Sequence, residues 1–298
     1  MDMLRITGLH KRFGDKDVLK GLELTVPEHS VFGFIGKNGA GKTTAMKTVL
    51  GLLKPDAGRI LVNGEPVVYG GTATNRHIGY LPDVPEFYPF MTAPEYLRFC
   101  GEITGLPRQE TEARSRELLE LVGLAGETHR IKGFSRGMKQ RLGIAQALLN
   151  RPRLLICDEP TSALDPTGRK EILNILLAAR EQTTVLFSTH ILSDVERICT
   201  DVALLHDGVI PIQGTLSQIK ARYRREEYLL EPEQSTDIPI LREAFSLEQT
   251  EQGQLVFREG THTLFDLLGF TAARRIRLVR LERAEPTLES LFMEVSGP

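Results

Sequence analysis

The residues best suited to chemistry lie near the N-terminus, where two glycines frame a loop that ends in a lysine and a threonine. The loop runs from Gly36 to Thr43 with the spacing G-x-x-x-x-G-K-T, after an apolar run at 31–35 and before a helix-compatible segment at 44–50. Glycines let successive backbone N–H groups point into one concavity at a helix N-terminus, where phosphate oxygens bind. Lys42 supplies charge and Thr43 a hydroxyl for Mg²⁺. An ordinary glycine turn is the alternative, but a strand before the loop and a helix after it are what phosphate binding requires.

Two carboxylates follow a second apolar run. A phosphate loop binds ATP or GTP, and hydrolysis also needs a Mg²⁺ ligand and a group that orients or deprotonates water. Asp158 and Glu159 come directly after residues 154–157, a run typical of a strand buried on both faces of a parallel sheet. Because ligands of open α/β sheets bind at the C-terminal ends of strands, Asp158 can hold Mg²⁺ and Glu159 can face the attacking water. Without Lys42, two surface carboxylates ending a strand would be the simpler interpretation.

Three further short motifs stand in order along the chain. Residues 134–141 read Phe-Ser-Arg-Gly-Met-Lys-Gln-Arg, residues 162–165 read Ser-Ala-Leu-Asp, and His190 follows a predicted strand. Together with the phosphate loop and the pair Asp158–Glu159, they resemble the motifs of ABC-type ATPases. Each short motif is weak alone, but five in sequence are specific, and the resemblance covers about residues 1–215.

The resemblance implies ATP and Mg²⁺ as cofactors, and a head-to-tail pair of subunits with two ATP molecules between them. Ser135 and the backbone of Gly137 would face the γ-phosphate bound by the other subunit, at a helix N-terminus left unused within its own subunit. His190 would contact the γ-phosphate of its own subunit's ATP and hold Glu159 and the water in place, although a lone histidine after a strand is more often structural. Phe13 would stack on adenine, where the family often has tyrosine; on its own, an aromatic there is more often part of the core.

The expected site residues fall into three groups. The catalytic group comprises Glu159, His190 and Asp83. The metal-binding group comprises Thr43, Asp83 and Asp158. The nucleotide-binding group comprises Phe13, Gly36, Asn38, Gly39, Ala40, Gly41, Lys42, Thr43, Thr44, Ser135, Gly137 and Asp165.

Three residues depart from the family pattern. Asp83 stands where the family usually has the glutamine that senses Mg²⁺ and water, so the site carries an extra carboxylate. Without the metal this carboxylate repels the γ-phosphate, which predicts a stronger Mg²⁺ dependence than glutamine would give. Arg136 and Met138 replace Gly and Gln within the signature motif. Because a cation near a positive helix end is unfavourable without a nearby anion, we expect Arg136 to reach a phosphate or an acidic residue across the subunit interface.

The elements that must position these residues alternate in type along the chain. Alternating apolar residues at 4–9 and 22–26 predict strands leading into the phosphate-loop strand, and 59–68 predicts a hairpin that turns at Asn63 and Gly64. Further strands are expected at 77–81, 154–157, 184–188, 202–206 and 209–212, with a helix at 169–180. Strands alternating with helices indicate an α/β fold with a largely parallel sheet. With the resemblance, the expected fold is a P-loop NTPase core of ABC type with an antiparallel β subdomain and an α-helical subdomain.

The α-helical subdomain is expected at about 84–150, as an insertion between strands of the nucleotide core. Thr92 and Glu95 predict a capping box at the start of one helix. Residues 108–122 predict an amphipathic helix whose charges, Arg114 among them, form a solvated face. The apolar and aromatic residues of 85–99 suit a coupling helix of a permease, and a local core explains them equally well.

A boundary near residue 220 divides the chain into an ATP-binding domain, 1–220, and a small C-terminal α+β domain, 221–298. The latter is expected to hold strands at 254–257 and 277–281 and helices at 238–245, 263–268 and 287–295. Its arginines could form a basic patch, but a solvated strand face is the more common explanation for Arg274, Arg275, Arg277, Arg280 and Arg283.

Composition excludes several classes of partner and location. The 298 residues carry a formal net charge of −2, which gives no general reason to bind nucleic acid. The three cysteines lack metal-ligand spacing and their odd number argues against a disulfide framework, so a reducing, cytoplasmic setting fits best. The first five residues do not look like a targeting signal, and no apolar run approaches the ~20 residues that span a bilayer. Another chain must then supply any membrane spans.

The sequence therefore predicts the ATP-binding and ATP-hydrolysing subunit of an ABC transporter, peripheral on the cytoplasmic side of the membrane. Its expected partners are a separate transmembrane permease and a second ATP-binding subunit, in a homodimer. The signature run and residues 285–292 resemble the bacterial ABC-2 type group, which mostly exports drugs, antimicrobial peptides or lipids. One alternative is a soluble ABC-type ATPase acting on ribosomes or DNA, but the chain lacks a second nucleotide domain and long coiled coils. Another is a low-turnover regulatory subunit, against which Glu159 and His190 argue.

Overall fold

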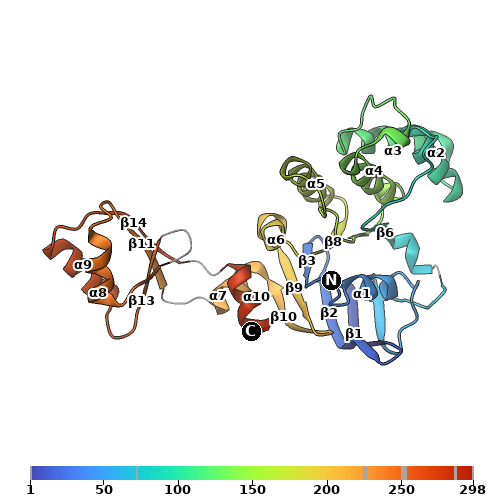
Figure 1. The fold of residues 1–298 in the computed structure, drawn as a ribbon. Coiled ribbons are helices and arrows are strands. Elements are labelled where there is room, and N and C mark those ends of the chain that lie inside the picture. The colour runs from blue at the N-terminus through green and yellow to red at the C-terminus, as the bar shows by residue number, and fades with distance from the viewer. Residues whose placement is uncertain (1, 72, 224–226, 250–253, 285–286, 297–298) are drawn as a thin grey trace. The chain divides into compact units, whose positions relative to one another are not determined.

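The chain forms two compact units. The computed structural model describes residues 2–71, 73–223, 227–249, 254–284 and 287–296. The first unit comprises residues 2–219 with the end of the last helix, and the second comprises residues 220–294. In Figure 1 the colour runs from blue to light orange through residues 2–219 and from orange to red through the second unit.

A six-stranded sheet carries the phosphate loop of the first unit. Its order is β10-β9-β3-β8-β7-β6. Its strands are β3 (Val31–Ile35), β6 (Ile78–Leu81), β7 (Leu154–Cys157), β8 (Thr184–Thr189), β9 (Asp201–His206) and β10 (Val209–Thr215). Neighbouring strands are parallel except β9 and β10, which form an antiparallel hairpin at one edge. Every residue of β3, β7 and β8 is buried, as their continuous apolar runs predict.

A second, antiparallel sheet has the order β2-β1-β4-β5. Its strands are β1 (Asp2–Phe13), β2 (Lys16–Pro27), β4 (Ala57–Val62) and β5 (Glu65–Pro66). Asn63 and Gly64 both have positive φ, 50° and 78°, which is the backbone of a tight type I′ hairpin turn. The predicted hairpin is thus confirmed. Its return strand is shorter than predicted: β5 ends at Pro66, and one further backbone hydrogen bond runs from the Val67 N–H to Ile60 O at 3.0 Å.

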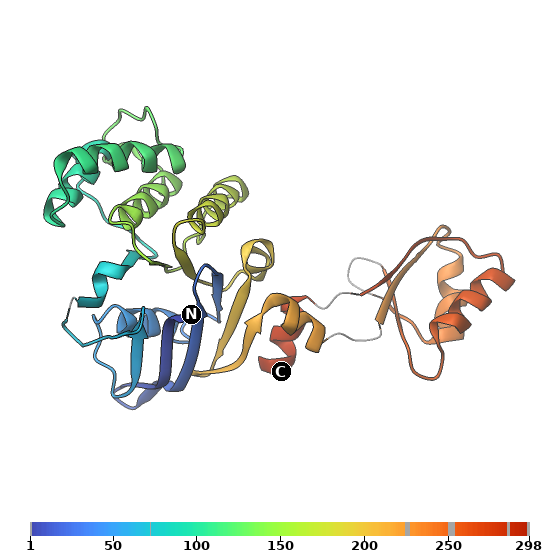
Figure 2. The same cartoon turned by 180° about the vertical axis from the view of Figure 1, so that it is seen from behind.

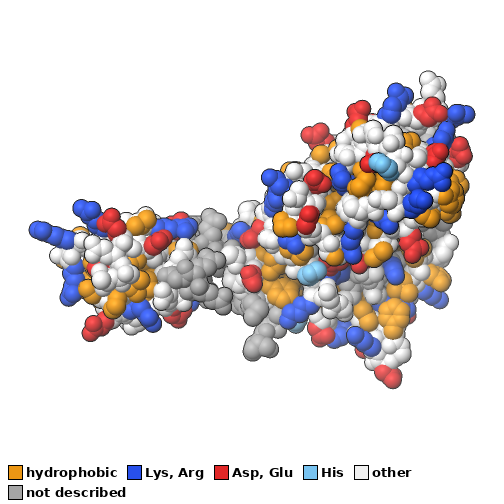
Figure 3. All heavy atoms as spheres, turned by 45° about the horizontal axis from the view of Figure 1, so that its top comes forward, with side chains coloured by type: hydrophobic (Ala, Val, Ile, Leu, Met, Phe, Trp, Pro, Cys, Tyr) orange, Lys and Arg blue, Asp and Glu red, His pale blue; other side chains and the backbone are white. Residues whose placement is uncertain are grey.

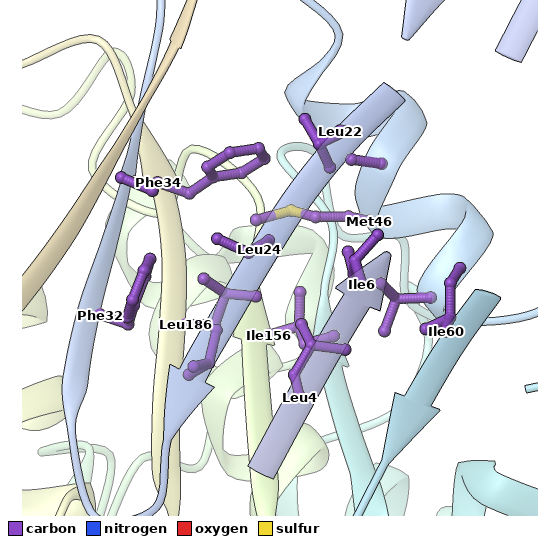
Figure 4. Packing of buried hydrophobic residues seen from close by; sticks show 14 of the residues in the cluster. Leu4, Ile6, Leu22, Leu24, Phe32, Phe34, Met46, Ile60, Ile156 and Leu186 are labelled. Atoms are coloured by element: carbon purple, nitrogen blue, oxygen red, sulfur yellow. The ribbon is translucent and has the colours of Figure 1, made fainter. Parts of the chain in front are cut away.

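One apolar core joins the two sheets to the helix that follows the phosphate loop, α1 (Lys42–Val49). Figure 4 shows side chains from both sheets converging on Met46 of this helix. They come from several strands and include Leu4, Ile6, Leu22, Leu24, Phe32, Phe34, Ile60, Ile156 and Leu186. Since α1 is fixed by this packing, the phosphate loop that starts it is held in one place.

The predicted helical insertion forms a group of three helices, seen together in both views (Figures 1 and 2). They are α2 (Ala93–Ile103), α3 (Arg108–Leu121) and α4 (Arg136–Leu148). The capping box of α2 is confirmed: Thr92 Oγ1 accepts from the Glu95 N–H, and Glu95 Oε2 accepts from the Thr92 N–H at 2.8 Å. The remaining helical elements of the first unit are the short 3₁₀ turns η1 (Ala73–His77) and η2 (Ile131–Gly133) and the helices α5 (Pro166–Ala179) and α6 (Leu192–Ile198). The helix α7 (Leu216–Arg222) crosses the boundary between the two units.

The expectation that Arg114 lies on a solvated face is wrong. Its side chain is 3% exposed. Its guanidinium lies 2.6 Å from Glu117 Oε1 and donates to Leu148 O at 3.3 Å and to Gln182 Oε1 at 3.1 Å. These three acceptors, one on the same helix and two from distant parts of the chain, take the place of water around the guanidinium. The two distant acceptors cannot be predicted from the charge pattern of α3.

The second unit is a four-stranded antiparallel sheet with helices packed against it. The sheet order is β12-β13-β11-β14, with strands β11 (Glu227–Pro232), β12 (Glu248–Gln249), β13 (Leu255–Arg258) and β14 (Leu278–Arg283). Its helices are α8 (Asp237–Phe245) and α9 (Leu264–Ala273), and α10 (Leu288–Ser296) ends the described chain. The predicted strands and helices are confirmed, while β11 was missed because it begins in a polar run. Arg277 and Arg280 are exposed and pair with Glu233 and Glu282, in line with a solvated strand face.

The surface matches the near-neutral net charge. On the face seen in Figure 3, positive and negative side chains are interspersed. Among the described residues, no helix combines the length and the apolar character needed to cross a bilayer.

Candidate nucleotide-binding site

A cavity of about 460 Å³ opens where the phosphate loop leaves β3. Its wall is formed by Phe13, Val18, Asn38, Gly39, Gly41, Lys42, Thr43, Thr44, Asp83, Glu159, Ser162 and His190. The structure therefore brings together most residues that the sequence singled out, from segments up to 177 positions apart. Phe13 stands at this wall with 48% of its surface exposed, so it is not part of the core. Val18 and Ser162 were not predicted.

The phosphate loop has the curled backbone that its glycines predict. Gly41 has φ 110°, a conformation that residues with a Cβ rarely adopt. A Cβ on Gly36 would lie 2.9 Å from Leu205 O, so this glycine permits close packing on β9. Lys42 is buried and its ammonium donates back to Gly36 O at 2.6 Å. Gly36 and Ala40 belong to the loop but do not line the cavity.

Asp158 lies under the loop, bound by two hydroxyls. Thr43 Oγ1 donates to Asp158 Oδ2 at 2.6 Å, and Ser188 Oγ donates to Asp158 Oδ1 at 2.6 Å. Ser188 Oγ in turn accepts from the Glu159 N–H at 2.9 Å. Ser188 therefore orients both carboxylate residues. Ser188 was not among the predicted site residues, although it ends a predicted strand two residues before His190.

Glu159 lies between two cationic or potentially cationic groups. Its Oε1 is 3.0 Å from Lys42 Nζ, and its Oε2 is 2.9 Å from His190 Nδ1. Oε1 is buried and makes no aligned hydrogen bond with the described residues, so the Lys42 contact is an ion pair. Glu159 has φ 47°, a strained backbone for a residue with a Cβ and one that recurs at functional sites.

The loop after Glu159 is anchored by a buried acid on α6. Thr161 Oγ1 donates to Asp194 Oδ2 at 2.7 Å, and both side chains are buried. Burial raises the pKa of Asp194, against the lowering effect of the Thr161 hydrogen bond and of Arg169. Since α6 starts two residues after His190, this contact ties the segments of Glu159 and His190 together.

Three predicted nucleotide ligands lie away from this cavity. Ser135 caps α4, where its hydroxyl accepts from the Met138 N–H at 3.2 Å. Gly137 lies in the first turn of the same helix. Asp165 caps α5, where its carboxylate accepts from the Gly168 N–H at 2.7 Å. Because the resemblance assigns Ser135 and Gly137 to a nucleotide held by another subunit, their expected role stays a prediction, as does that of Asp165.

Asp83 and Arg136 contact each other within one chain. Asp83 Oδ1 accepts from Ser162 Oγ at 3.0 Å and lies 3.5 Å from Arg136 Nη2. Arg136 also donates to Ser162 Oγ at 3.2 Å. We expected Arg136 to find its anion across a subunit interface. The structure instead pairs it with an acid of its own subunit.

The oxygen ligands fit a magnesium ion that arrives with a nucleotide. Among the described residues, no group of three or more acidic, histidine or cysteine side chains could hold a metal ion alone. Thr43 and Asp158 offer one hydroxyl and one carboxylate within 2.6 Å of each other. Mg²⁺ prefers such hard oxygen ligands and commonly takes one or two carboxylates, completing its shell with waters and phosphate oxygens.

Comparison with known proteins agrees with this geometry. Residues 19–162 match the family model of the ABC transporter, and residues 214–296 match that of the ATP-binding protein DrrA1-3-like, C-terminal domain. Among solved structures, the ATP-binding subunit of an ABC transporter superimposes with a TM-score of 0.66 and 33% identity, covering 74% of this chain and 93% of that one.

Curated relatives match nearly the whole chain. The uncharacterized ABC transporter ATP-binding protein YxlF of Bacillus subtilis is 36% identical over 98% of this chain and 99% of its own length. The bacitracin transport ATP-binding protein BcrA of Bacillus licheniformis is 34% identical, over 99% and 97%. The linearmycin resistance ATP-binding protein LnrL of Bacillus subtilis is 31% identical, over 99% and 98%. The phosphate loop, its paired carboxylates and this full-length similarity confirm the expected fold, and the chain belongs to the ATP-binding proteins of ABC transporters, a family of ATPases.

Proposed function

We propose that this chain hydrolyses ATP at the cavity beside its phosphate loop and thereby drives export through a separate transmembrane permease. The observation that carries the proposal is the position of Glu159. Its carboxylate is held between Lys42 and His190 at the wall of the cavity where a triphosphate would lie.

Each residue of the cavity has a separate proposed role. The loop N–H groups and Lys42 bind the phosphates, and Phe13 stacks on the adenine. Thr43 and Asp158 would hold Mg²⁺, which would neutralise phosphate charge when bound. Glu159 Oε1 accepts a proton from, or orients, the attacking water, while His190 fixes the carboxylate.

Entry of ATP changes the partners of Lys42. In the structure its ammonium contacts Glu159 and the carbonyl of Gly36. Phosphate oxygens carry more charge than either, so they attract the ammonium, and Glu159 Oε1 becomes free to bind water. Nucleotide binding therefore prepares the base for catalysis.

Two subunits and a permease complete the proposed transporter. Ser135 and Gly137 would face the γ-phosphate of a second copy, so that ATP closes a homodimer and hydrolysis reopens it. The relatives named for bacitracin transport and linearmycin resistance support export. A second cavity, of about 470 Å³, is lined by residues such as Val84, Pro85 and Phe87 and suits a coupling helix of the permease on the cytoplasmic side.

Purification from detergent-solubilised membranes tests the proposal. The tagged chain should carry a polytopic membrane protein with it, and the complex should hydrolyse ATP in the presence of Mg²⁺. Glu159→Gln should lower turnover at least a hundredfold and trap an ATP-bound dimer, because the base is lost while the phosphate ligands remain. An ATP-loaded Glu159→Gln complex that stays monomeric, or a chain recovered without any membrane protein, would contradict the proposal.

A further inference from the structure

Two residues that depart from the family pattern meet in this structure. Asp83 follows β6 and Arg136 is the first residue of α4, yet their side chains lie 3.5 Å apart. Ser162 joins them, because its hydroxyl donates to Asp83 Oδ1 at 3.0 Å and accepts from Arg136 Nη2 at 3.2 Å. The three side chains form a closed triangle of polar contacts.

The triangle lies between the two cavities. Asp83 lines both, and Ser162 lines the nucleotide cavity. Arg136 lines only the second cavity. Arg136 is not among the residues that line the nucleotide cavity, whereas its two contact partners, Asp83 and Ser162, both line it. An effect of Arg136 on a nucleotide of its own subunit should therefore pass through these partners.

The charges of Asp83 and Arg136 should affect the binding of an anionic ligand. A carboxylate in the wall of a phosphate site repels the ligand unless a cation offsets it. Both side chains are nearly half exposed, Asp83 at 47% and Arg136 at 46%, so their pairing adds little to the stability of the fold. Its effect should appear instead in the affinity for a polyanion that enters beside Asp83.

We propose that Arg136 is a positioning residue for the nucleotide of its own subunit: with Ser162 it holds the Asp83 carboxylate and offsets its charge, so that a triphosphate can bind beside it. The inference rests on the proposed function, since it takes the cavity as an ATP site. It links the signature motif to the phosphate site within one chain.

A double-mutant cycle tests the inference. Wild type, Arg136→Gln, Asp83→Asn and the double variant are titrated with a fluorescent ATP analogue at low ionic strength, with EDTA and again with Mg²⁺, on isolated subunits kept monomeric by dilution. Without metal, Arg136→Gln should weaken binding about fivefold where Asp83 is present and less than twofold in the Asp83→Asn background. Mg²⁺ should reduce the difference, because the ion offsets the same repulsion.

Two controls separate charge offset from other effects. Arg116→Gln removes an exposed arginine from α3 and should leave affinity unchanged in both backgrounds. Ser162→Ala keeps both charges but removes the bridge, and should weaken metal-free binding less than Arg136→Gln does. Thermal unfolding of each variant checks that the fold is intact.

Equal losses from Arg136→Gln in both Asp83 backgrounds would overturn the inference, because they would mean direct contact with the nucleotide. The absence of any loss would overturn it as well. These measurements do not involve the permease. Failure to recover a permease would therefore count against the proposed function, while the double-mutant cycle would still test the role of Arg136. A wild-type subunit that binds no nucleotide would defeat both.

Discussion

At the scale of single residues, the site depends on side chains that orient Asp158 and Glu159 by hydrogen bonds. Asp158 is buried and receives hydrogen bonds from Thr43 and Ser188. Two hydroxyl donors fix the orientation of this buried carboxylate. The same Ser188 hydroxyl accepts from the Glu159 N–H, so one buried serine aligns the proposed metal ligand and the proposed base.

Replacing Ser188 with alanine should therefore impair catalysis more than nucleotide affinity. We expect the kcat of ATP hydrolysis to fall about tenfold and the Mg²⁺ concentration for half-maximal activity to rise, since one hydrogen bond to a charged group is worth about 1.5–3 kcal/mol. Steady-state kinetics over a Mg²⁺ titration measures both.

Ser30→Ala provides the matched control. Ser30 is also buried, but its hydroxyl donates to Pro27 O before the start of β3, the strand whose other end leads into the phosphate loop. It should lower stability without shifting the Mg²⁺ titration. If both serine variants changed the titration alike, the special role of Ser188 would be refuted.

At the scale of elements, β6 and α4 approach each other more closely than side chains would allow. A Cβ on Gly79 would lie 2.1 Å from the backbone oxygen of Ala147. β6 leads to Asp83 and α4 starts at Arg136, so this contact helps to fix the two elements that position the charged residues.

Gly79→Ala should consequently lower the free energy of unfolding of the first unit by about 1–3 kcal/mol, because the added methyl group would force apart the backbones of the strand and the helix. Denaturant unfolding monitored by circular dichroism measures the change. Gly133→Ala is the control, since a Cβ there meets nothing within 4 Å. A Gly79→Ala protein as stable as Gly133→Ala would show that β6 and α4 are not packed as described.

At the scale of the whole molecule, the two units have separate apolar cores. One core joins both sheets of the first unit, and the other gathers Leu230, Leu241, Phe257 and Leu267 in the second. Phe257 is 1% exposed and forms an edge-on contact with Phe245. Each unit therefore has its own source of stability.

Phe257→Ala should lower the stability of the second unit by about 3–5 kcal/mol and leave nucleotide binding by the first unit unchanged. Calorimetry should then show one transition shifted and the other in place. Phe265→Ala, in the same unit but 83% exposed, should shift neither. A loss of nucleotide affinity in Phe257→Ala would mean that the two units are energetically coupled.

Much of the site could be predicted from local sequence. The phosphate loop, the strand before Asp158 and the capping box of α2 depend on residues close together in the chain, so spacing and residue type were sufficient. Tertiary contacts decided the rest: Ser188 is recognisable only because β7 and β8 are neighbours, and Arg114 is buried because acceptors from α4 and the loop after α5 reach it.

The pairing of Asp83 with Arg136 is the clearest case of what sequence alone could not give. Both residues stood out as departures from a pattern, but they are 53 positions apart, and nothing local says that their elements touch. The sequence states the charge of each residue, because charge depends on residue type. The strength of their interaction depends on the distance between the two side chains, and the packing of β6 and α4 in the tertiary structure determines that distance.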